Sequence, residues 1–316
     1  MKRYLLLRDF GKRHVNRSPK KTERALSINS IIISKVEQHL KLLAICDRVE
    51  MIVSDYEDLI IDDANNIWLE APMIIPICKS DIEVMKMGGK PDYVWLKCKH
   101  GAEPRPGFDR VLSYDRYLDS KETLALIYEE LQKYISESKQ MNGKVKLNCS
   151  GPVIRMEVYP NSWWLSWGSR LYTVDIVPAY KLGEELYESK PVESDEMPGP
   201  TIWHRSFALQ ERKKLCKGSK KILRVLRGLR DFGNFSSYQL KNVVFHEMDA
   251  NQDWSEPVLR RRLADVLERL EKSLQARNLP NYFLPEINLL SNMPLSTIAY
   301  MCYRIQRLPA CEIEIC

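Results

Sequence analysis

The sequence lacks any long hydrophobic run, and this absence excludes several classes of protein. The longest apolar run near the start, Tyr4 to Leu7, is far shorter than the core of a secretory signal peptide and is followed by Arg8 and Asp9. No stretch approaches the roughly 20 apolar residues that a membrane-spanning helix needs. We therefore expect a soluble protein that is neither exported nor bound to a membrane.

Paired cysteines are also missing. The eight cysteines are scattered, with no CxxC pair and no dense spacing that would indicate a disulfide-stabilised fold. Cys98 and His100 are close in sequence, but two potential ligands without further ones nearby are a weak signal for zinc. We expect reduced thiols and a cytoplasmic protein, with the nucleus as the alternative location.

A strong excess of charge of one sign is absent as well. The 48 basic and 42 acidic residues leave a net charge of +6, which does not by itself indicate binding to nucleic acid. The distribution is more informative, because basic residues concentrate in the first two dozen positions and again from Arg212 to Arg230. The candidates for binding nucleic acid in the second stretch are Arg212, Lys213, Lys214, Lys217, Lys220 and Lys221.

Helical periodicity is clear at two places in the first half of the sequence. Apolar residues recur at three- and four-residue steps from Ala25 to Leu43, which predicts a long amphipathic helix over residues 22–45. Asp119 supplies helix-start chemistry for a second amphipathic helix that ends near Ser138. We expect the first helix to be a spine shared by two lobes.

Strand patterns lie on both sides of the second helix. β-branched and aromatic residues, with turn signals between them, predict strands over residues 145–149, 153–158 and 171–177. Short apolar runs at residues 71–76 and 93–96 predict further strands or irregular sheet edges. Together these segments predict a mixed sheet.

The sequence changes in character after this sheet region. Residues 184–200 are acidic and contain prolines, which is typical of a surface loop between lobes. Helical patterns dominate from Trp203 onward, over residues 207–215, 222–229, 240–246 and 258–274. Since a single core stops growing at roughly 250–300 residues, we predict an α+β protein of two lobes, a mixed-sheet lobe over residues 1–200 and a helical bundle over residues 201–316.

Five motifs follow one another in the second half. They are Trp203-His204-Arg205-Ser206-Phe207 with Glu211 downstream, Val225 to Asp231, Ser237-Tyr238-Gln239-Leu240-Lys241, Trp254, and Leu279 to Leu289. In this order they resemble the male-abnormal family of nucleotidyltransferase-fold proteins, which includes cyclic GMP-AMP synthase and the cGAS-like receptors. The segment from Leu171 to Tyr180 resembles the family's Val-Asp strand. The resemblance implies a two-lobed nucleotidyltransferase fold.

Nucleotidyl transfer in such a fold needs two divalent ions, Mg²⁺ or Mn²⁺, held by three carboxylates. Two of these belong on one strand at alternate positions, and the third comes from a neighbouring strand. Asp175 matches the third carboxylate. An alignment through Ser54 to Asp58 places Asn66 and Trp68 where active members carry Glu and Asp. The resemblance therefore implies that two of the three metal-binding carboxylates are missing.

A shifted alignment leaves this conclusion in place. It could recruit Asp62, Asp63 or Glu70 as a metal ligand. Asp62 is followed two residues later by Ala64, and Glu70 by Pro72, so neither forms a carboxylate pair on one strand face.

The nucleotide pocket implied by the resemblance is better preserved. Tyr238 matches the residue whose ring stacks on a base, and Arg227 matches a lysine directed at phosphate. The candidate nucleotide-binding residues are Ser54, Glu211, Arg227, Ser237, Tyr238 and Lys241. The alternative interpretation makes Tyr238 a packed helix-start residue and the basic residues a solvated surface. His204 replaces an arginine that contacts the acceptor base.

The resemblance also bears on the activating ligand and on zinc binding. The zinc-binding thumb of the vertebrate DNA sensor needs a His and several cysteines between the first two motifs, where this sequence has only Cys216, so we expect no zinc. Many zinc-free relatives sense double-stranded RNA along a basic groove, which requires only backbone and shape contacts.

Three hypotheses for function remain. The leading one is a catalytically degraded family member that binds ATP, GTP or a protein partner and acts as a scaffold or regulator. The second is an active cGAS-like receptor of innate immunity, which makes a cyclic dinucleotide from ATP and GTP on sensing double-stranded RNA. The third is a developmental family member with no nucleotide-related role.

Overall fold

The structure is a computed structural model that divides into two compact units between Leu209 and Gln210. The sequence analysis placed this boundary slightly earlier, after residue 200. A mixed sheet dominates the first unit and helices make up the second, which confirms the predicted α+β class. The described residues are 30–31, 33–43, 48–51, 60–61, 67–101, 107–139, 141–142, 145–151, 153–159, 172–189, 202–230 and 235–306. For residues 60–61, 67–70, 150 and 227–230, only the backbone is described.

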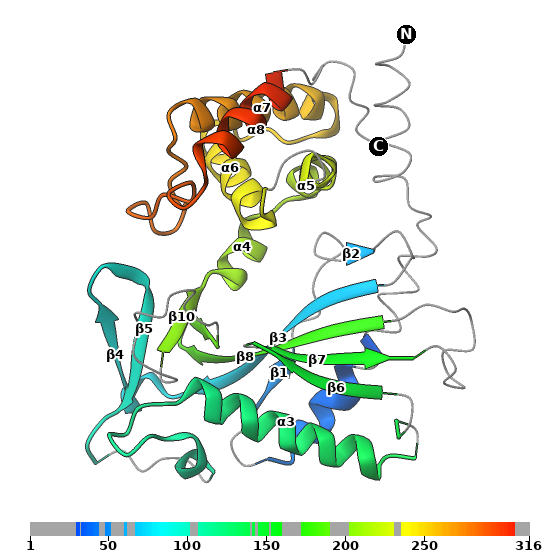
Figure 1. Cartoon of the computed structure of the whole chain (residues 1–316), viewed down its shortest axis with the longest axis vertical. Coiled ribbons are helices and arrows are strands. Elements are labelled where there is room, and N and C mark those ends of the chain that lie inside the picture. Colours follow the sequence, from blue (N-terminus) through cyan, green and yellow to red (C-terminus); the bar gives the residue numbers. More distant parts are fainter. Residues whose placement is uncertain are drawn as a thin grey trace. The chain divides into compact units, whose positions relative to one another are not determined.

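The first unit is built on a ten-stranded sheet (Figure 1). Its main path runs through β1 (Glu50–Met51), β3 (Ile67–Ile77), β8 (Tyr172–Leu182), β9 (Glu185–Glu188), β10 (Ile202–Ser206), β5 (Lys90–Cys98) and β4 (Ile82–Met87). Off this path, β2 (Ile60–Ile61) pairs with β3, and β7 (Val153–Val158) pairs with β8 and with β6 (Val145–Ser150). β3 and β8 are parallel and the other pairs are antiparallel.

Helices cover one face of this sheet. α3 (Ser120–Glu137) runs along it (Figure 1), and Asp119 caps the helix by accepting hydrogen bonds from the backbone nitrogens of Lys121 and Glu122 at 2.8 and 3.1 Å. The second predicted helix is therefore confirmed. Of the predicted spine helix, residues 33–40 are helical and residues 41–43 form a turn, so this helix ends before residue 45. Its beginning lies outside the described residues. The described part of this unit also contains two 3-10 turns, η4 (Lys79–Asp81) and η5 (Phe108–Val111).

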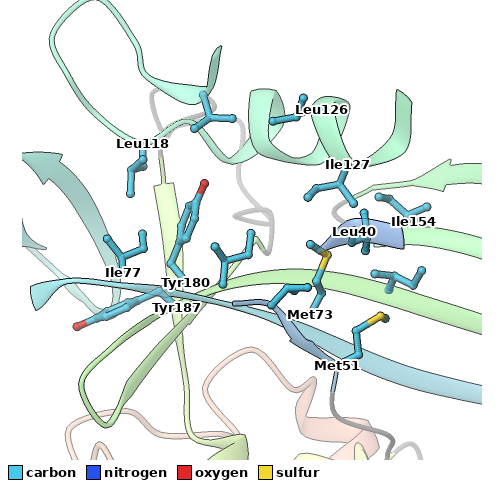
Figure 2. Close-up of a cluster of buried hydrophobic side chains, with 14 of the residues drawn as sticks. Leu40, Met51, Met73, Ile77, Leu118, Leu126, Ile127, Ile154, Tyr180 and Tyr187 are labelled. Carbon is cyan, nitrogen blue, oxygen red and sulfur yellow. The ribbon is translucent and has the colours of Figure 1, made fainter. Parts of the chain in front are cut away.

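The main hydrophobic core lies between the sheet and these helices. Figure 2 shows Ile127 of α3 and Leu40 beside Met73 and Ile154 of the sheet, and these four residues belong with Leu126 to the same buried cluster. On β8, Val174, Ile176 and Tyr180 belong to that cluster. Because side chains alternate along a strand, Asp175, Val177 and Ala179 face the opposite side of the sheet.

Two predicted features of the first unit are wrong. Residues 185–188 were expected in a surface loop but form β9, whose Leu186, Tyr187 and Glu188 are buried. Trp203 was expected to begin a helical region but lies in β10, where it is fully buried and its indole nitrogen donates to the Leu118 carbonyl at 2.8 Å. Acidic residues and nearby prolines hid both strands, because the sheet neighbour that donates a hydrogen bond to Glu188 is distant in sequence. The Ser206 hydroxyl donates to that carboxylate at 2.5 Å.

The second unit is a bundle of helices, as predicted. α4 (Ala208–Lys214) crosses the boundary, and α5 (Lys217–Arg230), α6 (Ser237–Ala250), η6 (Glu256–Val258), α7 (Leu259–Gln275) and α8 (Leu295–Gln306) follow. Ser236 and Gln239 form a reciprocal cap at the start of α6. A single buried cluster, which includes Leu226, Val243 and Leu263, holds α5, α6 and α7 together. None of the helices in the described part of the chain is both long and apolar enough to span a membrane.

Replacing Gly218 by alanine tests how closely α5 packs on the loop before α7. Gly218 is buried, and a Cβ atom there would overlap the carbonyl oxygen of Trp254 and approach Leu259 Cδ2 to 2.8 Å. We expect Gly218→Ala to lower the free energy of unfolding by about 1–3 kcal/mol, measured by chemical denaturation. Gly88→Ala is the control, since a Cβ atom there meets nothing within 4 Å. Equal effects of the two variants would contradict the close packing.

Candidate functional site

Asp175 lies on the face of the sheet opposite α3. Its neighbours Val174 and Ile176 point into the main core, so strand alternation directs Asp175 to the other side. Antiparallel pairing places Arg155 of β7 beside it, and parallel pairing places the backbone of Glu70 of β3 on its other flank. Asp175 is therefore the middle position of a row across three strands.

Arg155 and Asp175 form a bidentate ion pair. Arg155 Nε donates to Asp175 Oδ1 at 2.8 Å, and Nη2 donates to Oδ2 at 2.8 Å. The side chains are 29% and 26% exposed, respectively. The hydrogen bond with Asp175 is the main reason why the pKa of Arg155 is raised above its usual value. Both oxygens of the predicted metal ligand already face a cation that stays charged at every physiological pH.

This arrangement does not fit the two divalent ions that nucleotidyl transfer requires. A metal ion would need the Asp175 oxygens that the guanidinium now holds, together with further carboxylates. Within the part of the chain that the structure describes, no group of three or more His, Cys, Asp or Glu residues is placed to hold a metal ion.

The two positions predicted to have lost their carboxylates are only partly described. Asn66 lies outside the described residues, as does Ser54 of the upstream turn. Trp68 is described in its backbone alone and pairs with Thr173, whereas Glu70 pairs with Asp175. The loss of metal ligands at Asn66 and Trp68 therefore remains a prediction, and the register identifies Glu70 as the acidic residue to test beside Asp175.

The predicted nucleotide-binding residues of the second unit lie mainly at the start of α6. Lys241 Nζ donates to Glu211 Oε2 of α4 at 3.1 Å, and Glu211 is 7% exposed. The structure thus brings two of the predicted residues together as an ion pair. Ser237 begins α6, and Arg227 lies in α5 with only its backbone described.

Tyr238 is tied to the loop that follows α7. Its hydroxyl accepts a hydrogen bond from Asn281 Nδ2 at 2.9 Å, and its carbonyl accepts one from Asn242 Nδ2 at 2.8 Å. Asn242 Oδ1 in turn accepts from the backbone nitrogen of Tyr282 at 2.6 Å. The hydroxyl end of Tyr238 therefore has a structural role, as in the packed helix-start interpretation.

Sequence reasoning missed both asparagines of this network. Each is buried, with 0% exposure for Asn242 and 3% for Asn281. A signal was available for Asn242, which lies four residues after Tyr238 and so shares its helix face. Asn281 lies inside the motif from Leu279 to Leu289, where only packing and turns were considered.

The predicted nucleic-acid-binding residues differ in their surroundings. Lys214 Nζ lies 2.6 Å from Asp249 Oδ1 and above the Tyr282 ring, and Lys221 pairs with Glu256 at 2.5 Å. Burial lowers the pKa of Lys214, but hydrogen bonds with Asp249 and Tyr282 outweigh this effect and raise it overall. The exposed members of the group are Arg212, Lys213 and Lys217. Lys220 is half-buried. Part of the basic stretch is thus neutralised within the unit.

Comparison with known proteins agrees with the motifs. Residues 218–307 match the family model of the Mab-21 protein HhH/H2TH-like domain. The chain is 25% identical to Cyclic GMP-AMP synthase-like receptor 3 of Stylophora pistillata, in a match that covers 97% of this chain and 94% of that protein. A shorter match, 32% identical over 117 residues, covers 34% of this chain and 25% of Mitochondrial dynamics protein MID49 of Xenopus laevis.

Replacing Lys241 by methionine separates a structural role from a nucleotide-binding role. We expect Lys241→Met to lower the free energy of unfolding by about 1–3 kcal/mol, because the buried Glu211 carboxylate loses its ammonium partner. In the double variant Glu211→Gln/Lys241→Met the loss should be smaller than the sum of the single losses, since the two residues are coupled.

Lys272→Met is the matched control for this experiment. It makes the same substitution in an ion pair with Glu268 whose side chains are 70% and 62% exposed, so the expected change is below about 0.5 kcal/mol. If Lys241→Met proves as mild as this control in chemical denaturation, the structural role of Lys241 is refuted and nucleotide binding becomes the better explanation of its presence.

Proposed function

Since the chain belongs to the male-abnormal and cGAS-like family of nucleotidyltransferase-fold proteins, we propose that it is a member with a degraded catalytic site. It binds a nucleotide such as ATP or GTP, or a protein partner, and acts as a scaffold or regulator. The observation that carries this proposal is the bidentate ion pair between Arg155 and Asp175.

Charge balance supports the loss of catalysis. Three carboxylates supply three negative charges against the four positive charges of two divalent ions, and the ions neutralise the charge that develops on the phosphates. In this chain Asp175 is already neutralised by Arg155. Recruiting a metal ion would require breaking two charge-assisted hydrogen bonds and leaving a guanidinium beside a divalent cation, which is repulsive at short range.

A role in the cytoplasm is part of this proposal. All five cysteines in the described portion, Cys78, Cys98, Cys149, Cys216 and Cys302, are free. Free thiols are favoured where glutathione and thioredoxin keep them reduced.

An active receptor is the second candidate, and one observation favours it. The backbone of Glu70 lies directly beside that of Asp175 on the neighbouring parallel strand, so two acidic residues are adjacent in the sheet. The name of the similar Stylophora protein, a cyclic GMP-AMP synthase-like receptor, fits the same reading. In this case double-stranded RNA would activate synthesis of a cyclic dinucleotide with Mg²⁺ or Mn²⁺.

A product assay distinguishes the two candidates. We expect the full chain, incubated with ATP, GTP, Mg²⁺ or Mn²⁺ and double-stranded RNA, to give no more cyclic dinucleotide than Asp175→Ala, because the carboxylates cannot hold the metal ions. The measurement is chromatographic separation of products. Product that is lost in Asp175→Ala would contradict the proposal, and its additional loss in Glu70→Gln would identify Glu70 as the second metal ligand.

The basic stretch gives a separate prediction about nucleic acid. We expect weak, sequence-independent and salt-sensitive binding of double-stranded RNA, because exposed lysines displace counterions but do not read bases. The variant Lys213→Glu/Lys217→Glu should weaken binding and flatten the plot of log affinity against log salt by about two units, one for each phosphate contact. Lys214 is left in place because an acid there would face Asp249.

The control for this binding experiment changes the net charge equally. Lys121→Glu/Lys133→Glu reverses two exposed lysines of α3 and should leave the salt dependence as it is in the unmodified chain. If binding is negligible near physiological salt, or if both double variants behave alike, the stretch is an ordinary solvated surface and the hypothesis of RNA sensing loses its main support.

A further inference from the structure

On the face of the sheet opposite α3, Asp175 is paired with a cationic side chain, that of Arg155. Arg155 lies directly opposite Asp175 in the β7–β8 register, so the pair needs no bend in either strand to form. Both hydrogen bonds are 2.8 Å long, the length expected for a charge-assisted pair of good geometry. The position that a divalent ion would occupy at this carboxylate is held by a side chain of the chain itself.

We propose that Arg155 is a fixed counter-ion that replaces the divalent cation at Asp175, so that this site excludes Mg²⁺ and Mn²⁺. A nucleotide bound by the chain is then bound without a divalent ion at Asp175. This inference deepens the proposed function and rests on it only in its statement about the nucleotide. The exclusion of metal at Asp175 stands on the ion pair alone.

The surroundings of the pair explain why a guanidinium can take this place. Glu157 follows Arg155 by two residues on the same face of β7, and its charge adds to that of Asp175 in raising the pKa of Arg155. The pair is only partly buried, so the desolvation that makes a buried charge costly is incomplete here. A cation at Arg155 is therefore well tolerated by its neighbours.

The same face provides oxygen donors once the guanidinium is removed. Thr173 precedes Asp175 by two residues and so lies on the same side of β8. It is 2% exposed, and its hydroxyl, one of the described buried groups, has no hydrogen-bond partner. A hydroxyl and a carboxylate oxygen are ligands that Mg²⁺ and Mn²⁺ prefer. We hold Arg155 responsible for keeping the ion from the Asp175 carboxylate, in addition to the lack of further carboxylates among the described residues.

Mn²⁺ binding to the full chain tests the exclusion directly. In titrations followed by electron paramagnetic resonance, we expect Arg155→Gln to bind Mn²⁺ at least about tenfold more tightly than the unmodified chain, which corresponds to about 1.4 kcal/mol. The gain should disappear in Arg155→Gln/Asp175→Asn, because the carboxylate is then absent. Arg155→Lys should show no gain, since the cation is retained.

A matched control and a second readout guard against loss of folding. Lys146→Gln removes a base from the same face of the sheet, opposite Glu157 in the β6–β7 register, and should leave Mn²⁺ affinity unchanged. Added Mn²⁺ should also raise the melting temperature of Arg155→Gln but not that of the unmodified chain, because a ligand stabilises only the folded form that binds it. If Arg155→Gln binds Mn²⁺ no better than the unmodified chain, or Lys146→Gln gains as much, the counter-ion role is refuted.

A separate experiment tests whether nucleotide binding is independent of metal ions. Binding of a fluorescent ATP analogue to the unmodified chain should have the same affinity in Mg²⁺ and in EDTA, within about twofold. Binding that requires Mg²⁺ would overturn metal independence. Absence of any binding, with the Mn²⁺ result as expected, would refute the nucleotide role of the proposed function while leaving the counter-ion role of Arg155 in place.

Discussion

The parallel pairing of β3 with β8 is the constraint on which the first unit depends. It runs in unbroken register from Ile67 and Tyr172 to Ile77 and Leu182, and it joins segments that are far apart in sequence. Parallel strands cannot be linked by a short turn, and the connection between these two includes β4, β5, α3, β6 and β7. The pairing fixes both faces of β8 at once, the core face with Val174 and Ile176 and the opposite face with Asp175.

β8 pairs with two antiparallel neighbours, one after the other along its length, and Pro178 lies where one pairing ends and the next begins. β7 pairs with residues 172–176 of β8, and β9 pairs with residues 179–182. Pro178 lies between these two ranges, where the missing backbone N–H removes no hydrogen bond to either neighbour. Its carbonyl accepts from the backbone nitrogen of Ser189 at 3.0 Å. A proline in the middle of a long strand is thereby compatible with the sheet.

Local signals in the sequence predicted much of the fold. The features that depend on pairing between strands distant in sequence could not be predicted from it. The limits of α3 and β7 could be predicted because Asp119 is a strong N-cap and residues 153–158 alternate regularly. β8 was predicted to end at residue 177, since a proline usually ends a strand. The role of Pro178 depends on which strands lie beside it, and β9 and β10 were missed for the same reason. α8 was missed as well, although Asn292 and Pro294, which lie just before it, are residues typical of a helix start.

The candidate site, too, was only partly predictable from the sequence. The motif around Asp175 identified a carboxylate on a strand, which the structure bears out. That Arg155 would bind it depends on the antiparallel register of two strands, and a shift of one residue would have turned Arg155 to the core face. The pairing of Lys241 with Glu211 likewise joins two helices. The sequence thus identified the charged residues at the predicted sites, but it did not identify the partners that balance their charge.

Several acidic residues in both units form ion pairs with basic residues of the same chain. Exposure separates these pairs in energy. Lys214 and Asp249 pair at the surface, where an ion pair contributes about 0–1 kcal/mol. Glu247 is 5% exposed in its side chain and accepts a hydrogen bond from Arg269 Nε at 2.7 Å, with Arg262 Nη1 3.8 Å away. Losing both basic partners would leave an uncompensated buried charge and cost several times more. The pair at Asp175 lies between these extremes, buried enough to hold its geometry and exposed enough for a ligand to reach it. Under the proposed function, such a site stays open to a ligand while Arg155 takes the place of a metal ion at Asp175.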